Sequence, residues 1–224
     1  TKPGITLRSE SGNRDAVVID GEYQTQELIS INASNVTIAH LTLMRAVHHP
    51  IHVTGGPSAD VTGTVLHDLH VVDGAQQQIE VNASRHYDGI SRNNFIAASI
   101  SQFDVGIELA QARGAKVFHN TIFHPPDAFS SIDARFPNTL ADVKNNIVVS
   151  LTHRNGGQTN ASNNLTGVTS ALFVSAAQGD LHLVPGATVA IDKGATMSPS
   201  EHGLDIDGEA HDNGPPDIGA DEVH

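Results

Sequence analysis

Four polar residues recur along this chain at intervals of 25 to 28 residues, each flanked by two apolar residues. They are His52, Glu80, Glu108 and Asp133. If the four segments stack as strands, the apolar neighbours point inward and the polar residues form one row on an outer face. Carboxylates at such a spacing repel one another unless a cation or a proton relieves them. This row is therefore the first place to look for chemistry.

The oxygen atoms of Glu80, Glu108 and Asp133 suit Ca²⁺, which accepts irregular all-oxygen coordination. In a uronate lyase, such a cation would neutralise the substrate carboxylate and acidify the C5 proton. A base would then remove that proton and the glycosidic bond would break by β-elimination. His52 and Arg135 are the candidate catalytic bases by position, since Arg135 lies two residues past Asp133. The simpler alternative is that these acids only solubilise an outer strand face.

A histidine cluster is the second candidate. His49 and His52 flank Pro50, and His70 follows about one period later. Imidazoles bind Zn²⁺ or Cu²⁺, so His49, His52 and His70 form a possible transition-metal set, while His49 and His70 are candidate substrate-binding residues. The alternative is that these are solvated or hydrogen-bonded surface histidines, which is the commoner situation.

The acidic tail invites a calcium interpretation as well, because Asp205-Ile206-Asp207-Gly208 resembles the start of a calcium loop. The closing Glu at loop spacing is missing, which favours a structural turn. The tail acids are Asp205, Asp207, Asp212, Asp217 and Asp221.

Composition narrows the function classes. The 224 residues carry a net charge of −13 and no Cys, which excludes disulfides and thiolate chemistry and argues against a nucleic-acid partner. No apolar run approaches the length of a membrane span. Motifs for serine hydrolases, phosphate-binding loops, dinucleotide binding and zinc proteases are absent from the sequence.

The elements that must position the row are short strands broken by Gly, Asn and Asp. Asn94, Asn120 and Asn146 recur every 26 residues, in phase with the row, and predict a ladder of stacked side-chain amides. His40 and Asp68 are the expected upstream equivalents, and Asn164 the downstream one. Residues 104–116 are helix-like in composition, but their phase in the repeat favours strand.

These patterns predict one all-β domain, a right-handed parallel β-helix of roughly six coils. Residues 1–166 form the coils. Residues 167–224, where the period loosens, form the final strands and an irregular C-terminal cap of the same domain. The opening Thr1-Lys2-Pro3-Gly4 looks like the middle of a structure, so we expect residues upstream of it.

Several segments resemble bacterial parallel β-helix proteins of the pectate-lyase-like superfamily, over nearly the whole chain. They are Lys2-Pro3-Gly4-Ile5-Thr6-Leu7-Arg8, Val18-Ile19-Asp20-Gly21, the Asn-Asn segments, residues 130–139, Gly179-Asp180-Leu181-His182-Leu183 and Pro216-Asp217-Ile218-Gly219-Ala220-Asp221-Glu222. The polygalacturonase and pectate lyase motifs of this superfamily are missing. Alginate-type lyases combine calcium with a Lys and an Arg on neighbouring coils, and no such basic pair is evident in phase.

The resemblance implies a protein that is secreted or at the cell surface and whose partner is a polysaccharide. We expect a calcium-assisted uronate lyase. The alternative is a non-catalytic β-helix that serves as a surface, structural or carbohydrate-binding module.

Overall fold

The chain folds as an all-β parallel β-solenoid, as the repeat predicts. The computed structural model describes residues 2–56, 59–211 and 214–224, so Thr1 and Asp212 lie outside the described part. Three parallel sheets run along the stack, and the chain makes about five turns, close to the six coils expected. None of the described helices is long and apolar enough to cross a membrane.

The chain passes through the three sheets in the order A, B, C, and its last coil ends after the strand in sheet B. Sheet A contains β1 (Thr6–Arg8), β4 (Thr37–Ala39), β7 (Val65–His67), β10 (Ile90–Arg92), β13 (Arg113–Phe118), β16 (Leu140–Lys144) and β19 (Gln158–Ser162). Sheet B contains β2 (Val18–Asp20), β5 (Thr42–Met44), β8 (His70–Val72), β11 (Phe95–Ala97), β14 (Thr121–Phe123), β17 (Ile147–Val148) and β20 (Leu165–Thr166). Sheet C contains β3 (Glu27–Ile31), β6 (His49–Thr54), β9 (Gln76–Asn82), β12 (Phe103–Ala110), β15 (Ser130–Arg135) and β18 (Leu151–Arg154).

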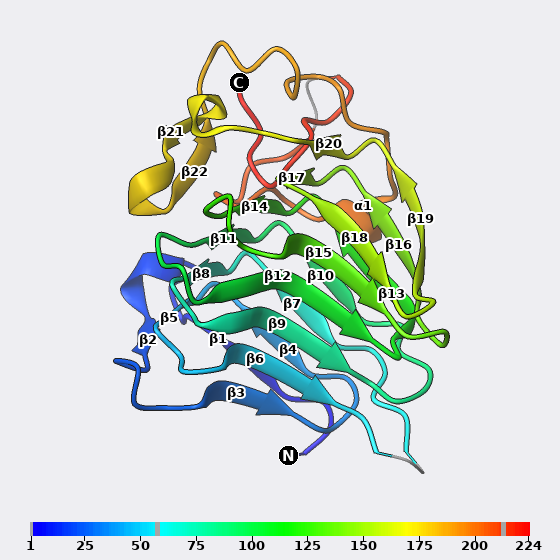
Figure 1. Ribbon diagram of the computed structural model, residues 1–224. Coiled ribbons are helices and arrows are strands. Elements are labelled where there is room, and N and C mark those ends of the chain that lie inside the picture. The colour runs from blue at the N-terminus through cyan, green and yellow to red at the C-terminus, as the bar shows by residue number, and fades with distance from the viewer. Residues whose placement is uncertain (1, 57–58, 212–213) are drawn as a thin grey trace.

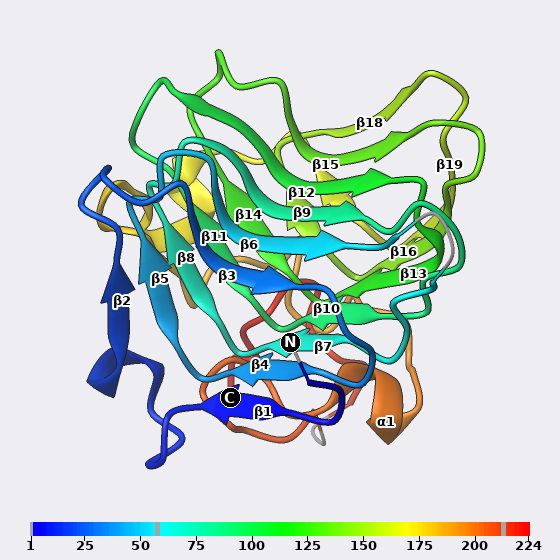
Figure 2. The ribbon, with the colours of Figure 1, turned by 90° about the horizontal axis from the view of Figure 1, so that it is seen from below.

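The coils stack in chain order from the blue N-terminal strands to the yellow-green β18–β20, and the view from below shows the three sheets around one core (Figures 1 and 2). That core consists of aliphatic side chains in register, such as Ile51, Ile79, Ile107 and Ile132. The helix-like stretch 104–116 is strand, as its phase predicted, since it belongs to β12 and β13.

Sheets A and B meet at a two-residue corner. Its first residue is left-handed in every coil after the first, with φ between 49° and 55°, and its second points inward. The first residues are His40, Asp68, Asn93, His119, Asn145 and Asn163, here called the corner column. Asn and Asp tolerate this conformation better than most residues, which explains their frequency there.

The second corner position carries the predicted asparagine ladder. The backbone N–H of Asn94 donates to Oδ1 of Asn120 at 3.3 Å, and that of Asn120 to Oδ1 of Asn146 at 2.9 Å. Asn146 repeats the pattern with Asn164 at 3.0 Å, so the downstream member is confirmed. The ladder satisfies buried backbone groups at a bend that sheet hydrogen bonds cannot reach.

The prediction is wrong for the two upstream members of the ladder. His40 and Asp68 belong to the corner column, one residue before the ladder position, which Leu41 and Leu69 occupy instead. The ladder ends where Leu69 donates its backbone N–H to Oδ1 of Asn94 at 3.0 Å. An Asn-Asn pair holds both corner positions, and the sequence alone does not tell which one a lone polar residue takes.

Residues after β20 leave the stack and pack against its side. The elements there are η2 (Ser170–Leu172), β21 (Phe173–Ser175), η3 (Ala176–Gln178), β22 (Asp180–Leu183) and α1 (Pro199–His202), while η1 (Arg14–Ala16) precedes β2. The β21–β22 hairpin is antiparallel and covers the outer face of sheet B, where Phe173 and Leu181 join Phe95 and Ile147 in a second core.

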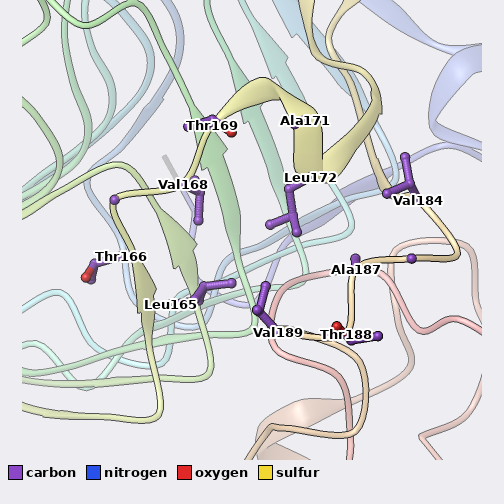
Figure 3. A pocket seen from close by; sticks show the side chains of 12 residues that line it. Leu165, Thr166, Val168, Thr169, Ala171, Leu172, Val184, Ala187, Thr188 and Val189 are labelled. Atoms are coloured by element: carbon purple, nitrogen blue, oxygen red, sulfur yellow. The ribbon is translucent and has the colours of Figure 1, made fainter.

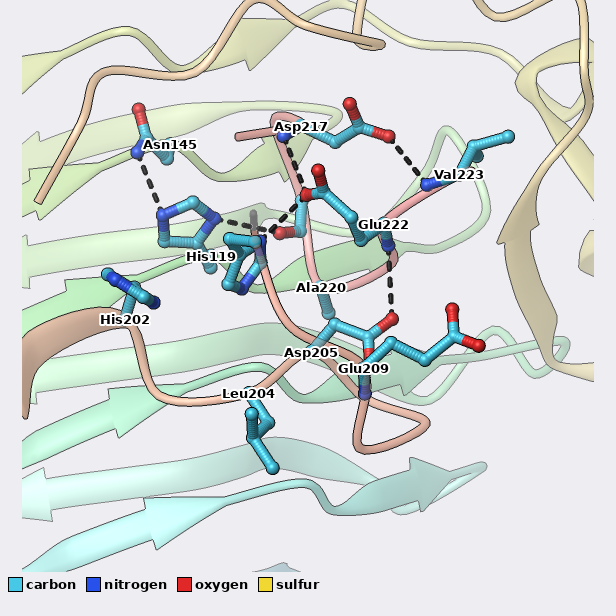
Figure 4. Close-up of polar contacts among 12 residues, drawn as sticks. His119, Asn145, His202, Leu204, Asp205, Glu209, Asp217, Ala220, Glu222 and Val223 are labelled. Atoms are coloured by element: carbon cyan, nitrogen blue, oxygen red, sulfur yellow. Dashed lines mark hydrogen bonds and ion pairs between the residues drawn. The ribbon is translucent and has the colours of Figure 1, made fainter. Parts of the chain in front are cut away.

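The residues after β22, here called the tail, then run back over the corner column. His119 Nδ1–H donates to the carbonyl of Gly219 at 3.2 Å, and its Nε2 accepts from Asn145 at 2.8 Å (Figure 4). Burial, with repulsion from His211, lowers the pKa of His119 to about 3, so the ring is neutral. Asn145 also bonds Ala195 in both directions at 2.8 Å.

Two of the tail acids, Asp205 and Asp217, hold turns of the backbone, the role favoured from the sequence. Asp205 accepts backbone N–H groups from Asp207, Glu209 and Glu222 at 2.6–3.1 Å, and the Asp217 carboxylate accepts that of Val223 at 2.9 Å (Figure 4). The tail therefore lies along the side of the coils and reaches the first ones. Strand β19 of the last coil stays largely exposed.

Removing the central ladder amide tests its role. Asn120 is fully buried, and its side chain makes bonds to Asn94, Asn146 and two backbone carbonyls. Because Asn120→Ala leaves buried groups without partners, we expect a loss of about 3 kcal/mol in the free energy of unfolding, measured by urea denaturation. The exposed Asn160→Ala should cost less than about 0.5 kcal/mol. Equal effects of both variants would contradict a structural ladder.

The ion pairs of His182 predict a pH dependence of stability. Hydrogen bonds to Asp207 (2.8 Å) and Asp180 raise the pKa of His182 to about 9, and the bond from His182 lowers that of Asp207 to about 2. The contribution of His182 is complete below pH 6.5 and is lost as the pH rises toward 9, while that of Asp207 is lost as the pH falls from 3.8 to 2.

The stability gap between the wild type and His182→Gln should therefore be widest between pH about 4 and 6.5 and close above pH about 9. Urea denaturation across this range measures it. The exposed His86→Gln serves as control and should show no such gap. A gap for His182→Gln that stays constant from pH 6 to 9.5 would count against the pairing.

Candidate functional site

The predicted row exists as a continuous line of side chains on sheet C. His52 pairs in register with Glu80, Glu80 with Glu108, and Glu108 with Asp133. The apolar neighbours on either side of each residue point into the core, because side chains alternate along a strand. Thr152 continues the row on the last strand of the sheet. The sequence period thus placed these residues correctly on one face.

Two arginines cover the upper half of the row. Arg154 donates from Nη2 to Glu108 at 2.9 Å and from Nε to Asp133 at 2.8 Å, and Arg135 donates from Nη1 to Glu108 at 3.2 Å. Thr152 adds a bond from its hydroxyl to Asp133 at 2.6 Å. The carboxylates are 2% and 0% exposed, whereas about a third of each arginine side chain remains exposed.

Arg135 and Arg154 are themselves in register on neighbouring strands. The face therefore carries an arginine pair in phase, which differs from the Lys and Arg of alginate-type lyases. The last coil is shorter, so the two arginines are 19 residues apart and fall outside the 25-to-28-residue period. Each guanidinium also lies over an aromatic ring, Arg154 at 4.2 Å from the centre of Phe129 and Arg135 at 4.6 Å from that of Phe136.

The lower half of the row is a histidine–glutamate cluster. His49 Nε2 lies 2.9 Å from Glu80, and His52 Nδ1 lies 2.7 Å from Glu27. Burial opposes both charges, but the mutual hydrogen bond prevails, raising the pKa of His49 and lowering that of Glu80. The second ring nitrogen of His52 is covered and has no hydrogen-bond partner, and it lies 3.6 Å from Glu80.

The set proposed for calcium does not fit that ion as the side chains stand. Oxygens of Glu108 and Asp133 are directed at Arg135 and Arg154, which supply the positive charge that the row needs. Burial raises the pKa of Glu108, and the bond and charge of Arg135 offset this in part. A cation at this place would have to displace a guanidinium, so the arginines take the charge-neutralising role that was expected of calcium.

The structure does not bring His70 to the other two histidines. His70 lies on β8 of sheet B, whereas His49 and His52 lie on β6 of sheet C. Nε2 of His70 donates to the carbonyl of Gly179 in the hairpin at 3.0 Å. A metal site or substrate subsite shared by His49, His52 and His70 is therefore not formed. The spacing in the sequence predicts that His70 lies about one coil further along, but it does not show that His70 belongs to a different sheet.

An apolar hollow of about 340 Å³ lies elsewhere, between β20, η2 and residues 184–189 (Figure 3). Its walls include Leu165, Val168, Leu172, Val184 and Val189. The lining contains no titratable side chain, so this hollow offers packing surface but no acid–base or metal chemistry. Sheet C remains the better candidate for function.

Comparison with known proteins finds no family model that matches the chain and no match among curated proteins. The parallel β-solenoid itself is established by the strand register. The resemblance to the pectate-lyase-like superfamily is an expectation from the sequence segments, and neither comparison supports it.

Arg154 predicts a large stability effect because it bridges two buried carboxylates. Arg154→Gln leaves Asp133 without its guanidinium, and breaking such a buried pair costs about 3 kcal/mol at pH 7. The measurement is urea denaturation, with the exposed Arg113→Gln on sheet A as control, expected within about 0.5 kcal/mol of the wild type. A loss below 0.5 kcal/mol for both variants would mean that the arginine merely lies on the surface.

Proposed function

We propose that sheet C is a carbohydrate-binding face, centred on Arg135 and Arg154. The observation that carries this proposal is the in-register arginine pair, held by buried carboxylates and backed by aromatic rings. Such fixed guanidiniums lose little side-chain freedom on binding, and they present planar donors to hydroxyl or carboxylate oxygens. Phe129 is 43% exposed and adds an apolar surface for a sugar ring.

The six strands of sheet C suit an extended ligand. At about 4.8 Å per strand the face is about 24 Å long, and its outward side chains are polar in every coil between Ser30 and Thr152. A polysaccharide lying along the stack would contact successive coils. A partner of this kind would place the protein at the cell surface or outside the cell, as expected from the sequence.

A second candidate function is uronate lysis, which the arginine pair also favours. A uronate carboxylate bound by Arg135 and Arg154 would be neutralised without calcium, which acidifies the C5 proton. His52, the base expected from the sequence, lies on β6, two strands from Glu108, which Arg135 contacts, and so about 10 Å along the face from the bound carboxylate. Its free ring nitrogen is covered, so a side-chain movement would have to precede proton abstraction. Binding without turnover is therefore the function that the geometry supports best.

Binding to a panel of neutral and uronate polysaccharides tests the proposal, with ultraviolet absorbance of unsaturated products as the readout for lysis. We expect Arg135→Gln and Phe129→Ala to weaken binding about tenfold each, since each removes roughly 1.4 kcal/mol of contact. Arg113→Gln on sheet A should bind like the wild type.

Salt separates the two ligand classes. The net charge of −13 repels a polyanion, so raising the ionic strength should strengthen binding of a uronate chain and leave that of a neutral chain unchanged. Binding that is unaffected by both sheet C variants would refute the proposed face. Product absorbance that disappears in His52→Gln would establish the lyase in preference to a binding module.

A further inference from the structure

A cavity lies on the opposite side of the molecule from the sheet C face, between the corner column and the tail. It measures about 630 Å³. One wall consists of His40, His67, Asp68 and Arg92 from the coils, and the other of tail residues including His202, Gly203, Leu204 and His211. Figure 4 shows the tail segment with His202 and Leu204 passing over the strands beneath it.

The corner column explains why these groups face the cavity. Asn93, His119 and Asn145 of the column are bonded to the tail through their side chains. Asp68 and His40 belong to the same column, one and two coils earlier than Asn93 respectively. Their side chains line the cavity, where the tail makes no such bond to them among the described residues.

The three side chains are close enough to share one ion. His67 Nδ1 lies 2.6 Å and His40 Nε2 lies 3.7 Å from the same oxygen of Asp68. Their ligand atoms all lie within 4.8 Å of one another. Zinc bonds of about 2.0–2.2 Å in a tetrahedron place ligand atoms about 3.4 Å apart, which these distances bracket.

Buried polar atoms without partners are a second, independent observation. Asp68 is only 5% exposed, and its Oδ1 has no hydrogen-bond partner. Nε of Arg92 and Nε2 of His211, on the walls of the same cavity, also have none. Leaving such groups unpaired costs free energy, so a cavity with three of them on its walls is unusual for a structural space.

We propose that His40, His67 and Asp68 bind a divalent transition metal ion of the zinc class. Two imidazole nitrogens and one carboxylate oxygen form a typical three-ligand set that leaves a fourth position open. That position faces the cavity. His67 binds through Nδ1, so its proton must be carried on Nε2, and the present His67–Asp68 hydrogen bond gives way to two metal bonds.

In the other two candidate clusters of the described residues, every histidine is already paired with a carboxylate. His52 and His49 are bonded to Glu27 and Glu80 on sheet C. His182 is bonded to two aspartates, one of which, Asp207, also pairs with Arg14 at 3.0 Å. Neither cluster combines an unpartnered carboxylate oxygen with an adjoining cavity.

Isothermal titration calorimetry with Zn²⁺ tests the proposal, and the visible absorption of bound Co²⁺ is a second readout. Asp68→Asn and His40→Asn are suitable variants because Asn occupies the same left-handed position at Asn93, Asn145 and Asn163. Each should retain the fold and weaken Zn²⁺ binding about a hundredfold, since even groups that only orient a ligand cost roughly 10- to 100-fold.

Two controls make the result decisive. The exposed His86→Asn and the double variant His49→Ala/His52→Ala should keep wild-type affinity for one Zn²⁺ per chain. Zn²⁺ should also raise the melting temperature of the wild type but not of Asp68→Asn. Unchanged binding in both column variants would overturn the proposal. Binding that is lost instead in the sheet C double variant would overturn it as well, and would place the ion on that face.

Discussion

The corner between sheets A and B is the constraint on which the rest of this molecule depends. In every coil after the first, the chain bends there within two residues, the first left-handed and the second directed inward. Asn94, Asn120 and Asn146 satisfy the backbone groups that the bend leaves unpaired, and they do so by bonding the next coil. The same interaction therefore closes the corner and fixes the register of the stack.

The register of the coils in turn decides which side chains are neighbours on the surface. Side chains one coil apart lie about 4.8 Å from each other, so a polar row on sheet C becomes a line of interacting charges. Glu108 and Asp133 are tolerated inside that line because Arg135 and Arg154 neutralise them. The arginines are held in place by the same contacts, which makes the face rigid where it would meet a ligand.

The corner column has a further consequence on the other side of the solenoid. Its left-handed residues direct their side chains outward, and the tail uses several of them as docking points, such as His119 and Asn145. The tail contains several buried carboxylates that accept backbone N–H groups, so it is ordered although α1 is its only regular element among the described residues after β22. Where it spans His40 and Asp68, a cavity remains.

Period and alternation in the sequence show which face of a strand each residue takes. They are therefore enough to predict the solenoid, the inward and outward positions of its strands, and the row from His52 to Asp133. Only the tertiary structure decided which charges meet. The shorter last coil brings Arg154 to Glu108, 46 residues away, and the tail encloses His40 with Asp68. Such contacts depend on loop lengths and on the path of an aperiodic segment, which leave no repeating signal in a single chain.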